Sequence, residues 1–314
     1  MSWRILALAL VNSLIWAVYM LLTRHVVSGA HLDPWAYTLV QLLSAGLIML
    51  WVGRRTPGSW SDLLAPWTIG YAFLRVAING CTSAAIVWLA VTQSTLLATA
   101  SVLIGALSGW FLTRIAPTRR EWPGLLLLAV GVAAFAFAAV SDTTWRGLLW
   151  LCLSESLAVA GSWMIAYHPR NRATDMMARC RFTGEILVAA SVALILTWSL
   201  AGLGGLVISP WAGGGDAFGR IELWIYAALA GILFRAPGTW LGFWTINHVG
   251  VQAYLIALTA MPFFAIALEE AAARLGLLAP AGLSTGEWLA SAIILGASIW
   301  LISVRMKGSP AGAA

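Results

Sequence analysis

Charge is scarce in this 314-residue chain: Asp, Glu, Lys and Arg together make up 10% of it, against roughly 25% in soluble domains. Hydrophobic residues supply 61%, above the roughly 45–50% of a soluble domain. A water-soluble fold of this length cannot hide so much apolar surface. The composition therefore excludes an ordinary soluble protein and predicts an integral membrane protein.

Cysteine and histidine are also few, with three of the first and four of the second. Cys81, Cys152 and Cys180 lie in or beside apolar runs without metal-ligand spacing, so packing is their expected role. The histidines sit near the ends of apolar runs and form no cluster. We expect neither a metal nor a cofactor.

The net charge is +6, but the basic residues form no run that is interleaved with aromatic residues. This pattern excludes nucleic acid as an expected partner. The chain also has no P-loop pattern, so ATP is not expected to drive it directly.

Long apolar runs dominate what is present. A helix needs about 20 mostly apolar residues to cross a bilayer, and ten runs approach that length. They are residues 5–23, 35–53, 67–90, 93–113, 122–141, 147–168, 181–203, 222–246, 250–272 and 286–305. We predict an all-α membrane protein with ten transmembrane helices.

Positive charge is unevenly divided between the connections. If the N-terminus is cytoplasmic, 12 of the 18 Lys and Arg residues fall in cytoplasmic segments and four fall on the opposite side. Short cytoplasmic connections carry an excess of Lys and Arg. We therefore expect a multi-pass protein of the bacterial inner (cytoplasmic) membrane with both termini in the cytoplasm.

The two halves of the chain share features that indicate an internal repeat. Sliding the middle of the chain by 160 residues places Arg75 on Arg235 and Thr99 on Thr259. Each half has five spans, an odd number, so the second half enters the membrane from the opposite side. We predict that residues 1–141 and 142–314 form two inverted five-helix repeats of one transmembrane domain, an architecture of alternating-access transporters.

Two pairs of segments carry a family resemblance. "TLLATASVLIGALSGWFL" followed by "EWPGLLLLAVGVAAFA" is similar to the second part of an EamA repeat, and so is "QAYLIALTAMPFFAIAL" followed by "GEWLASAIILGASIWLI". The chain thus resembles an EamA-type permease of the drug/metabolite transporter superfamily. The resemblance implies ten helices in two inverted five-helix repeats, and export as the direction of transport.

The chain keeps one position of the family pattern and departs from others. Pro262 matches the family's proline in the ninth helix. The acids that often end helices four and nine are replaced by Ile115 and Leu275. Gln41 stands where an Arg is frequent in helix two, and Glu185 occupies the matching position of helix seven. These departures leave the substrate open.

Arg75 and Arg235 are the strongest functional candidates, because a charge inside the hydrocarbon costs about 2.5–3.5 kcal/mol on insertion scales. The functional interpretation is that both face one central cavity and bind a carboxylate or phosphate, which a guanidinium can hold at two points. The alternative is a buried ion pair with Glu155 or Glu185 that holds helices together.

Further substrate contacts are predicted around these arginines. Pro237 is expected to kink the eighth span and free a backbone carbonyl, and Asn79 lies in the matching neighbourhood of the third span. Gln41 lies early in span two. Trp16 and Trp163 match between the halves and could stack on a substrate, although most of the 19 tryptophans are expected to be interfacial anchors.

Acidic residues inside the spans are candidates for proton coupling. Glu155 and Glu185 are the two best placed, since burial disfavours the charged form of a carboxyl group; for Glu185 an interfacial side chain is the alternative. Glu269 and Glu270 lie near the outer end of the ninth span. The spacing of Glu270 and Arg274 predicts a helical pair, and we expect a structural role for both acids.

Together these patterns predict a secondary transporter, not an enzyme. Its substrate would be a small polar organic metabolite, an amino acid, organic acid or other anion or zwitterion, moved across the inner membrane by alternating access. The expected partners are this substrate and the bilayer, and "GALSG" at 105–109 fits close helix packing within one chain or in a homodimer. The alternative is a membrane-embedded enzyme acting on lipid or isoprenoid-linked groups, which would need clustered acids, or His with Ser or Asp, at one membrane face.

Overall fold

A computed structural model describes residues 3–58, 63–114, 116–141, 144–172, 175–203 and 215–307. Over these residues the structure is helical, with short connections and no strand. The predicted boundary between the two halves, at 141/142, adjoins residues 142–143, which lie outside the described residues.

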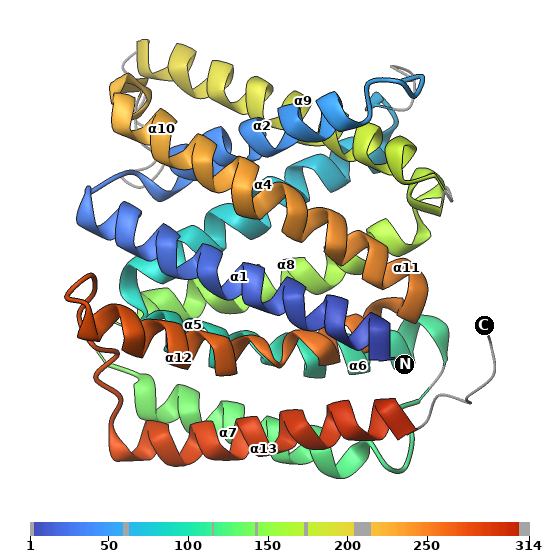
Figure 1. The fold of residues 1–314 in the computed structure, drawn as a ribbon, viewed down its shortest axis with the longest axis vertical. Helices are drawn as coiled ribbons and strands as arrows, with labels where there is room; N and C mark the ends of the chain where they lie inside the picture. The colour runs from blue at the N-terminus through green and yellow to red at the C-terminus, as the bar shows by residue number, and fades with distance from the viewer. Residues whose placement is uncertain are drawn as a thin grey trace.

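The first half of the chain contains α1, α2 and α4 to α7 (Figure 1). Their bounds are α1 Trp3–Gly29, α2 Pro34–Val52, α4 Pro66–Trp88, α5 Val91–Ala98, α6 Ala100–Thr113 and α7 Trp122–Ala139. Only Thr99 separates α5 from α6, so the two form one interrupted span of 23 residues.

The second half contains α8 to α13. Their bounds are α8 Trp145–Tyr167, α9 Met176–Leu203, α10 Ile221–Ala230, α11 Ala236–Leu258, α12 Met261–Arg274 and α13 Thr285–Lys307. A π-helical turn, Gly231–Arg235, joins α10 to α11, and short 3-10 helices cover Pro169–Arg172 and Gly215–Gly219.

Nine helical stretches of the described residues are long and apolar enough to cross a membrane, whereas the sequence predicted ten spans. The difference lies in Ile221–Leu258, which counts as one stretch of 38 residues. Within it Gly250 adopts φ 81° and ψ 167°, which is not helical, and the 14-residue α12 follows. The chain is a multi-pass membrane protein.

Local sequence explains where several helices begin. Asp33 caps α2, because its side chain accepts hydrogen bonds from the amides of Trp35 (2.9 Å) and Ala36 (2.8 Å). Pro34 and Pro66 stand at the first positions of α2 and α4. Proline has no N–H, and the first amides of a helix have no helical acceptor, so it fits there without loss of a hydrogen bond.

The helices lie side by side in a bundle in which α2 packs along α9, α4 along α8 and α7 along α13 (Figure 1). Glycines allow the closest approaches: a Cβ at Gly184 of α9 would lie 2.6 Å from the amide nitrogen of Leu50. One at Gly131 of α7 would lie 2.8 Å from Cγ1 of Ile294 in α13. α1 begins and α13 ends at the same edge of the bundle (right in Figure 1).

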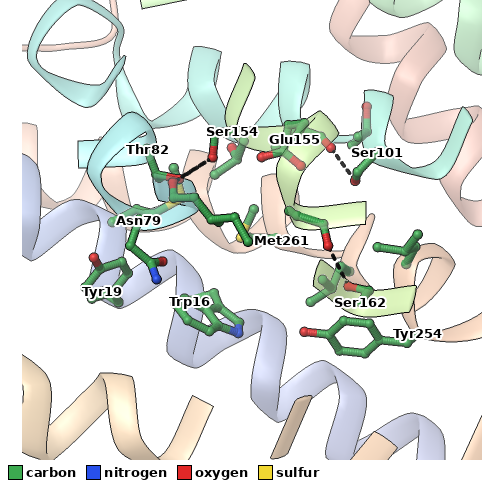
Figure 2. A pocket seen from close by; sticks show the side chains of 18 of the residues that line it. Trp16, Tyr19, Asn79, Thr82, Ser101, Ser154, Glu155, Ser162, Tyr254 and Met261 are labelled. Atoms are coloured by element: carbon green, nitrogen blue, oxygen red, sulfur yellow. Dashed lines mark hydrogen bonds between the residues drawn. The ribbon is translucent and has the colours of Figure 1, made fainter. Parts of the chain in front are cut away.

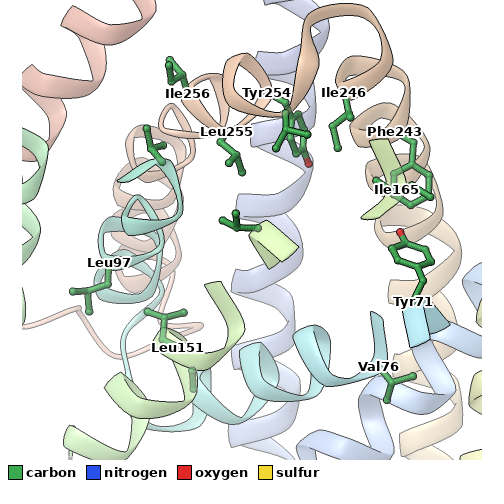
Figure 3. Packing of buried hydrophobic residues seen from close by; sticks show 14 of the residues in the cluster. Tyr71, Val76, Leu97, Leu151, Ile165, Phe243, Ile246, Tyr254, Leu255 and Ile256 are labelled. Atoms are coloured by element: carbon green, nitrogen blue, oxygen red, sulfur yellow. The ribbon is translucent and has the colours of Figure 1, made fainter. Parts of the chain in front are cut away.

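Apolar side chains fill the interior and also cover the outside. Tyr71, Phe243, Leu97 and Leu151 belong to one buried cluster that joins both halves (Figure 3). Large apolar side chains such as Phe137 of α7, which is 87% exposed, point outward. A surface of this kind suits lipid rather than water.

Candidate functional site

A cavity of about 160 Å³ lies within the bundle and is lined by helices from both halves of the chain. α1, α4, α5, α6, α8, α11, α12 and the π turn all contribute to it. Its apolar wall includes Trp16, Met20, Ile78, Leu255, Leu258 and Met261, and its polar wall includes Tyr19, Arg75, Asn79, Thr82, Thr99, Ser101, Ser154, Glu155, Ser162, Arg235, Tyr254 and Thr259.

Arg235 is almost fully buried, 1% exposed, in the wall of this cavity. Its guanidinium carbon lies 4.8 Å from the ring centroid of Trp16 and 5.1 Å from that of Tyr19. The two rings meet edge to face, with centroids 5.4 Å apart. Cation–π contacts hold the guanidinium without using its N–H donors. Within the described part of the chain, Nε and Nη2 have no hydrogen-bond partner.

The π turn positions this guanidinium. Arg235 is the last residue of Gly231–Arg235, and the amide of Ala236 donates to the carbonyl of Gly231, five residues earlier. Pro237 has no N–H to donate to the preceding turn. The kink expected at Pro237 therefore takes the form of a π turn, a feature frequent at functional sites. Pro237 itself is not among the residues lining the cavity, contrary to the prediction that it contacts substrate.

Arg75 lines the same cavity from α4. Its Nη2 donates to Oγ1 of Thr239 at 3.3 Å, and its guanidinium carbon lies 5.6 Å from the ring centroid of Phe243. Arg75 also lines a second, smaller cavity that shares Trp16 and Tyr254 with the first. It therefore stands where the two cavities meet, whereas Arg235 lines only the larger one.

Neither arginine forms an ion pair with a carboxylate in the described residues. The two arginines therefore do not form the alternative arrangement, a structural ion pair with Glu155 or Glu185. A buried cation without a counter-charge is unfavourable. An anion entering the cavity would relieve that cost.

A polar wall lies on the side of the cavity away from Trp16 and Tyr19 (Figure 2). Glu155 of α8 is part of it, and its side chain interacts with that of Ser101. The hydroxyls of Thr82 and Ser154 share a hydrogen bond of 2.6 Å. The cavity thus combines two cations, one acid and several hydroxyls.

Several predicted site residues do line the cavity, namely Trp16, Arg75, Asn79, Glu155 and Arg235. The side-chain Nδ2 of Asn79 donates to the backbone carbonyl of Arg75 at 2.5 Å, one turn earlier in α4. Their role in binding or coupling stays a prediction.

Two predicted contacts lie away from the cavity lining. Gln41 does not line the cavity but contacts Tyr19, which does: the Tyr19 hydroxyl donates to Oε1 of Gln41 at 2.9 Å. Trp163 packs against Tyr167, and its indole N–H donates to Oγ of Ser108 at 3.0 Å. The match of Trp163 with Trp16 in sequence is therefore not a match in position at the cavity.

Glu185 is also away from the cavity. Its Oε1 accepts from Nε of Arg181 at 2.6 Å, and its Oε2 lies 3.8 Å from Nη1 of Arg170. These partners belong to the first turns of α9 and to the 3-10 helix that precedes it. Of the two readings for Glu185, the interfacial one agrees with these contacts.

The polar wall was largely missed in the sequence, because single Ser, Thr and Tyr residues are common in apolar helices. One signal was available. The 160-residue slide that aligned the arginines also aligned Thr99 with Thr259, and both line the cavity. Each hydroxyl donates to the carbonyl three residues earlier, at 2.6 Å to Leu96 and 2.7 Å to Ile256.

No group of three or more His, Cys, Asp or Glu residues in the described ranges is placed to hold a metal ion. The three cysteines are free; Cys81 and Cys180 are buried and Cys152 is exposed.

The fold and the cavity define a class: a helical, multi-pass membrane protein with a polar chamber between its helices. Residues 3–137 match the model of the EamA-like transporter family. The match covers less than half of the chain. It agrees with the resemblance that the sequence motifs indicated, to a family of membrane transporters of the drug/metabolite transporter superfamily.

Comparisons with individual proteins add information on the fold alone. No curated protein matches the chain. Chains of solved structures do match, 28 in number. One is a crystal structure of a protein that is 16% identical, with a TM-score of 0.61 over 96% of this chain and 98% of that one.

Proposed function

We propose that the chain is a secondary transporter that moves a small organic anion or zwitterion by alternating access through the cavity. One observation carries the proposal: two guanidinium groups from different halves line one cavity, and within the described residues neither is paired with a carboxylate. A substrate carboxylate or phosphate would supply the missing partner, since such groups accept two N–H donors from one arginine.

The proposal includes ten crossings in two inverted halves, an arrangement used for alternating access. Gly250 interrupts the stretch Ile221–Leu258 near the predicted boundary between spans eight and nine. α1 begins and α13 ends at the same edge of the bundle, which requires an even number of crossings (Figure 1).

Matched details in the two halves support the inverted repeat. A glutamate lies at the start of both α7 and α13, and its carboxylate accepts a hydrogen bond from the backbone amide three residues earlier. Glu121 accepts from Thr118 and Glu287 from Ser284, each at 2.8 Å. The equivalent second helices, α2 and α9, pack along one another. The distribution of Lys and Arg supports a bacterial inner membrane with both termini in the cytoplasm.

Glu155 is the proposed coupling carboxylate, because it lines the cavity without an ion pair in the described part of the chain. Export is the direction that the family suggests. A homodimer stays a prediction, because nothing in a single chain tests it.

Reconstituted transport tests the proposal. Proteoliposomes loaded with unlabelled amino acids, organic acids or phosphorylated metabolites should take up the labelled form of one of them by exchange. Arg75→Gln and Arg235→Gln should each reduce that exchange at least tenfold. Arg274→Gln is the matched control, because this side chain is 78% exposed and pairs with Glu270 on the surface.

The competing class, a membrane-embedded enzyme, predicts a different result. It would chemically change a lipid or isoprenoid substrate and would exchange no labelled solute. Intact labelled solute recovered from the vesicles supports the transporter. A converted product, with no exchange of any compound in the series, overturns the proposal.

A further inference from the structure

Glu269 of α12 is buried, 1% exposed, although its neighbour Glu270 lies on the surface. Both of its carboxylate oxygens have partners in the first half of the chain. Oε1 pairs with Nη1 of Arg24 in α1 and accepts from the amide of Val91 at 3.2 Å. Oε2 accepts from the amide of Thr92 at 2.8 Å. The predicted helical pair of Glu270 with Arg274 is present on the surface, and the structural contacts of Glu269 are buried ones.

These amides belong to a helix that its own residues cap only in part: Oε1 of Gln93 accepts from the amide of Ala90 at 3.0 Å, which leaves the amides of Val91 and Thr92 without an acceptor in α5. α5 begins after Ala90, whose extended backbone ends the preceding connection and whose side chain has no acceptor. The first amides of a helix have no helical partner and carry the positive end of its dipole. The Glu269 carboxylate therefore caps α5 from the other half of the chain and pairs with α1 at the same point.

The contact lies between the cavity and the surface. Met20 and Thr95 line the cavity, each about one turn from Arg24 and Thr92 along α1 and α5. A buried apolar cluster that includes Ala17, Ile86, Val91 and Ala265 fills the space around this contact. On the outer side, Thr92 and Glu269 line a surface pocket together with Glu270.

The other end of the bundle also has a buried charged contact between the halves, but outside the helices that line the cavity: Glu121, before α7, pairs with Arg305 of α13. The residue 160 positions before Glu269 is Gly109, which has no side chain and packs against Trp163. Beside the cavity helices α4 and α8, the halves meet at that end through a neutral contact of 3.3 Å between Oγ1 of Thr68 and Nε2 of His168.

We propose that Glu269 closes one end of the cavity by holding α1, α5 and α12 together. Opening that end requires α12 to move away from α1 and α5, which breaks the ion pair and both hydrogen bonds from the backbone amides. At the opposite end the cavity helices meet through a neutral contact and can separate without that loss, because the Glu121–Arg305 pair joins α7 to α13 outside the cavity. This inference rests on the proposed function, since a closed end matters to a protein that alternates between two open ones.

Labelling of a cysteine tests the proposal without any substrate. Cys81, Cys152 and Cys180 are replaced by alanine, and Ala265→Cys places one thiol in the apolar cluster. The full-length protein in sealed vesicles of each orientation is treated with a charged, membrane-impermeant thiol reagent. With Glu269 intact, labelling from the Arg274 side should be slow.

Glu269→Gln keeps the volume of the side chain and removes its charge, and it should speed labelling by about tenfold, since hydrogen bonds to charged groups are the stronger ones. Arg24→Gln removes the ion pair alone and should give a smaller increase. Glu270→Gln is the control and should change nothing. Each variant is checked by thermal unfolding in detergent.

An unchanged labelling rate in Glu269→Gln and Arg24→Gln would overturn the proposal. An equal rise in Glu270→Gln would also overturn it, because a general loss of surface charge would then explain the effect. Arg75→Gln and Arg235→Gln do not touch this contact, so their failure to affect transport would leave the labelling result intact and would count against the proposed substrate site alone.

Discussion

At the scale of single residues, Arg235 and Arg75 are held in different ways. Arg235 lies against two aromatic rings that meet edge to face, and Arg75 donates to Thr239 beside Phe243. An aromatic clamp fixes the position of a guanidinium and leaves its donors available. We infer that Arg235 is the more rigid binding group and that Arg75, at the junction of two cavities, follows the substrate between them.

The clamp makes a prediction for Tyr19 and Gln41. Tyr19→Phe removes the hydrogen bond to Gln41 but keeps the ring under Arg235, so it should raise KM for the exchanged solute by about threefold. Tyr19→Leu also removes a cation–π contact worth roughly 0.5–2 kcal/mol and should raise KM further, with a smaller change in kcat. Equal effects of the two variants would contradict a role for the ring.

Glu155 makes a second prediction at this scale. Glu155→Gln keeps the shape of the side chain and removes its ability to carry a proton. Accumulation driven by a pH gradient should be lost, whereas exchange of labelled for unlabelled solute should persist. Proteoliposomes with and without a pH gradient separate the two activities. Gradient-driven accumulation that survives in the variant would exclude Glu155 as the coupling group.

The same scale shows what a single sequence can and cannot reveal. Arg75 and Arg235 could be found because a cation in an apolar run is costly. Gln41, Trp163 and Glu185 were misplaced, since a helix surrounded by lipid and protein is apolar on both sides and its sequence does not mark the face toward the cavity. The partners of Glu269 could not be predicted either, because they come from distant parts of the chain.

At the scale of elements, the interruptions of helices are the functional features. α5 and α6 are broken at Thr99, α11 and α12 at Thr259, and α10 joins α11 through the π turn. Broken helices at membrane depth are tolerated where they line a cavity, and all three interruptions do so. Pro237 indicated the third of these interruptions in the sequence, although its π geometry could not be predicted from the proline alone; the breaks at Thr99 and Thr259 were not predicted.

Replacing Pro237 tests the π turn. Pro237→Ala restores an N–H and permits regular α-helical bonding through the turn, which would rotate Arg235 relative to Trp16 and Tyr19. We expect an unfolding temperature equal to or above that of the parent and at least a several-fold loss of transport. A variant that transports normally would show that the turn does not position the arginine.

Close packing of α2 on α9 makes a prediction about stability. Gly184→Ala places a Cβ 2.6 Å from the amide nitrogen of Leu50 and 2.7 Å from the carbonyl oxygen of Gly46. Backbone atoms cannot give way easily, so we expect a loss of about 1–3 kcal/mol, seen as a lower unfolding temperature in detergent. Gly296→Ala, with no atom within 4 Å, is the matched control and should not lower it.

At the scale of the whole molecule, the bundle has two ends that differ in chemistry. At one end the buried carboxylate of Glu269 joins cavity helices from both halves. At the other end the cavity helices meet through a neutral contact, and the Glu121–Arg305 pair lies outside the cavity. The all-helical fold followed from hydropathy and the span ends from Pro, Gly and Arg. The difference between the two ends could not be predicted, because it depends on which helices meet.

The crossing at Gly250 gives a topological prediction. If the chain turns back there, residues 246–250 and the connection 275–284 lie on opposite sides of the membrane. Single cysteines introduced at Gly250 and at Ser284, in a background without Cys81, Cys152 and Cys180, should label from opposite faces of sealed vesicles. Labelling of both from one face would mean nine crossings rather than ten.

The central claim, that Arg75 and Arg235 together bind an anion in one cavity, is tested most directly by ligand-induced thermal shift. The purified protein is screened against amino acids, organic acids and phosphorylated metabolites, and then compared with Arg75→Gln, Arg235→Gln and the surface control Arg274→Gln. We predict a stabilising ligand bearing a carboxylate or phosphate whose shift is lost in both cavity variants and kept in the control. A full shift in both cavity variants, each folded as the parent is, would contradict the claim.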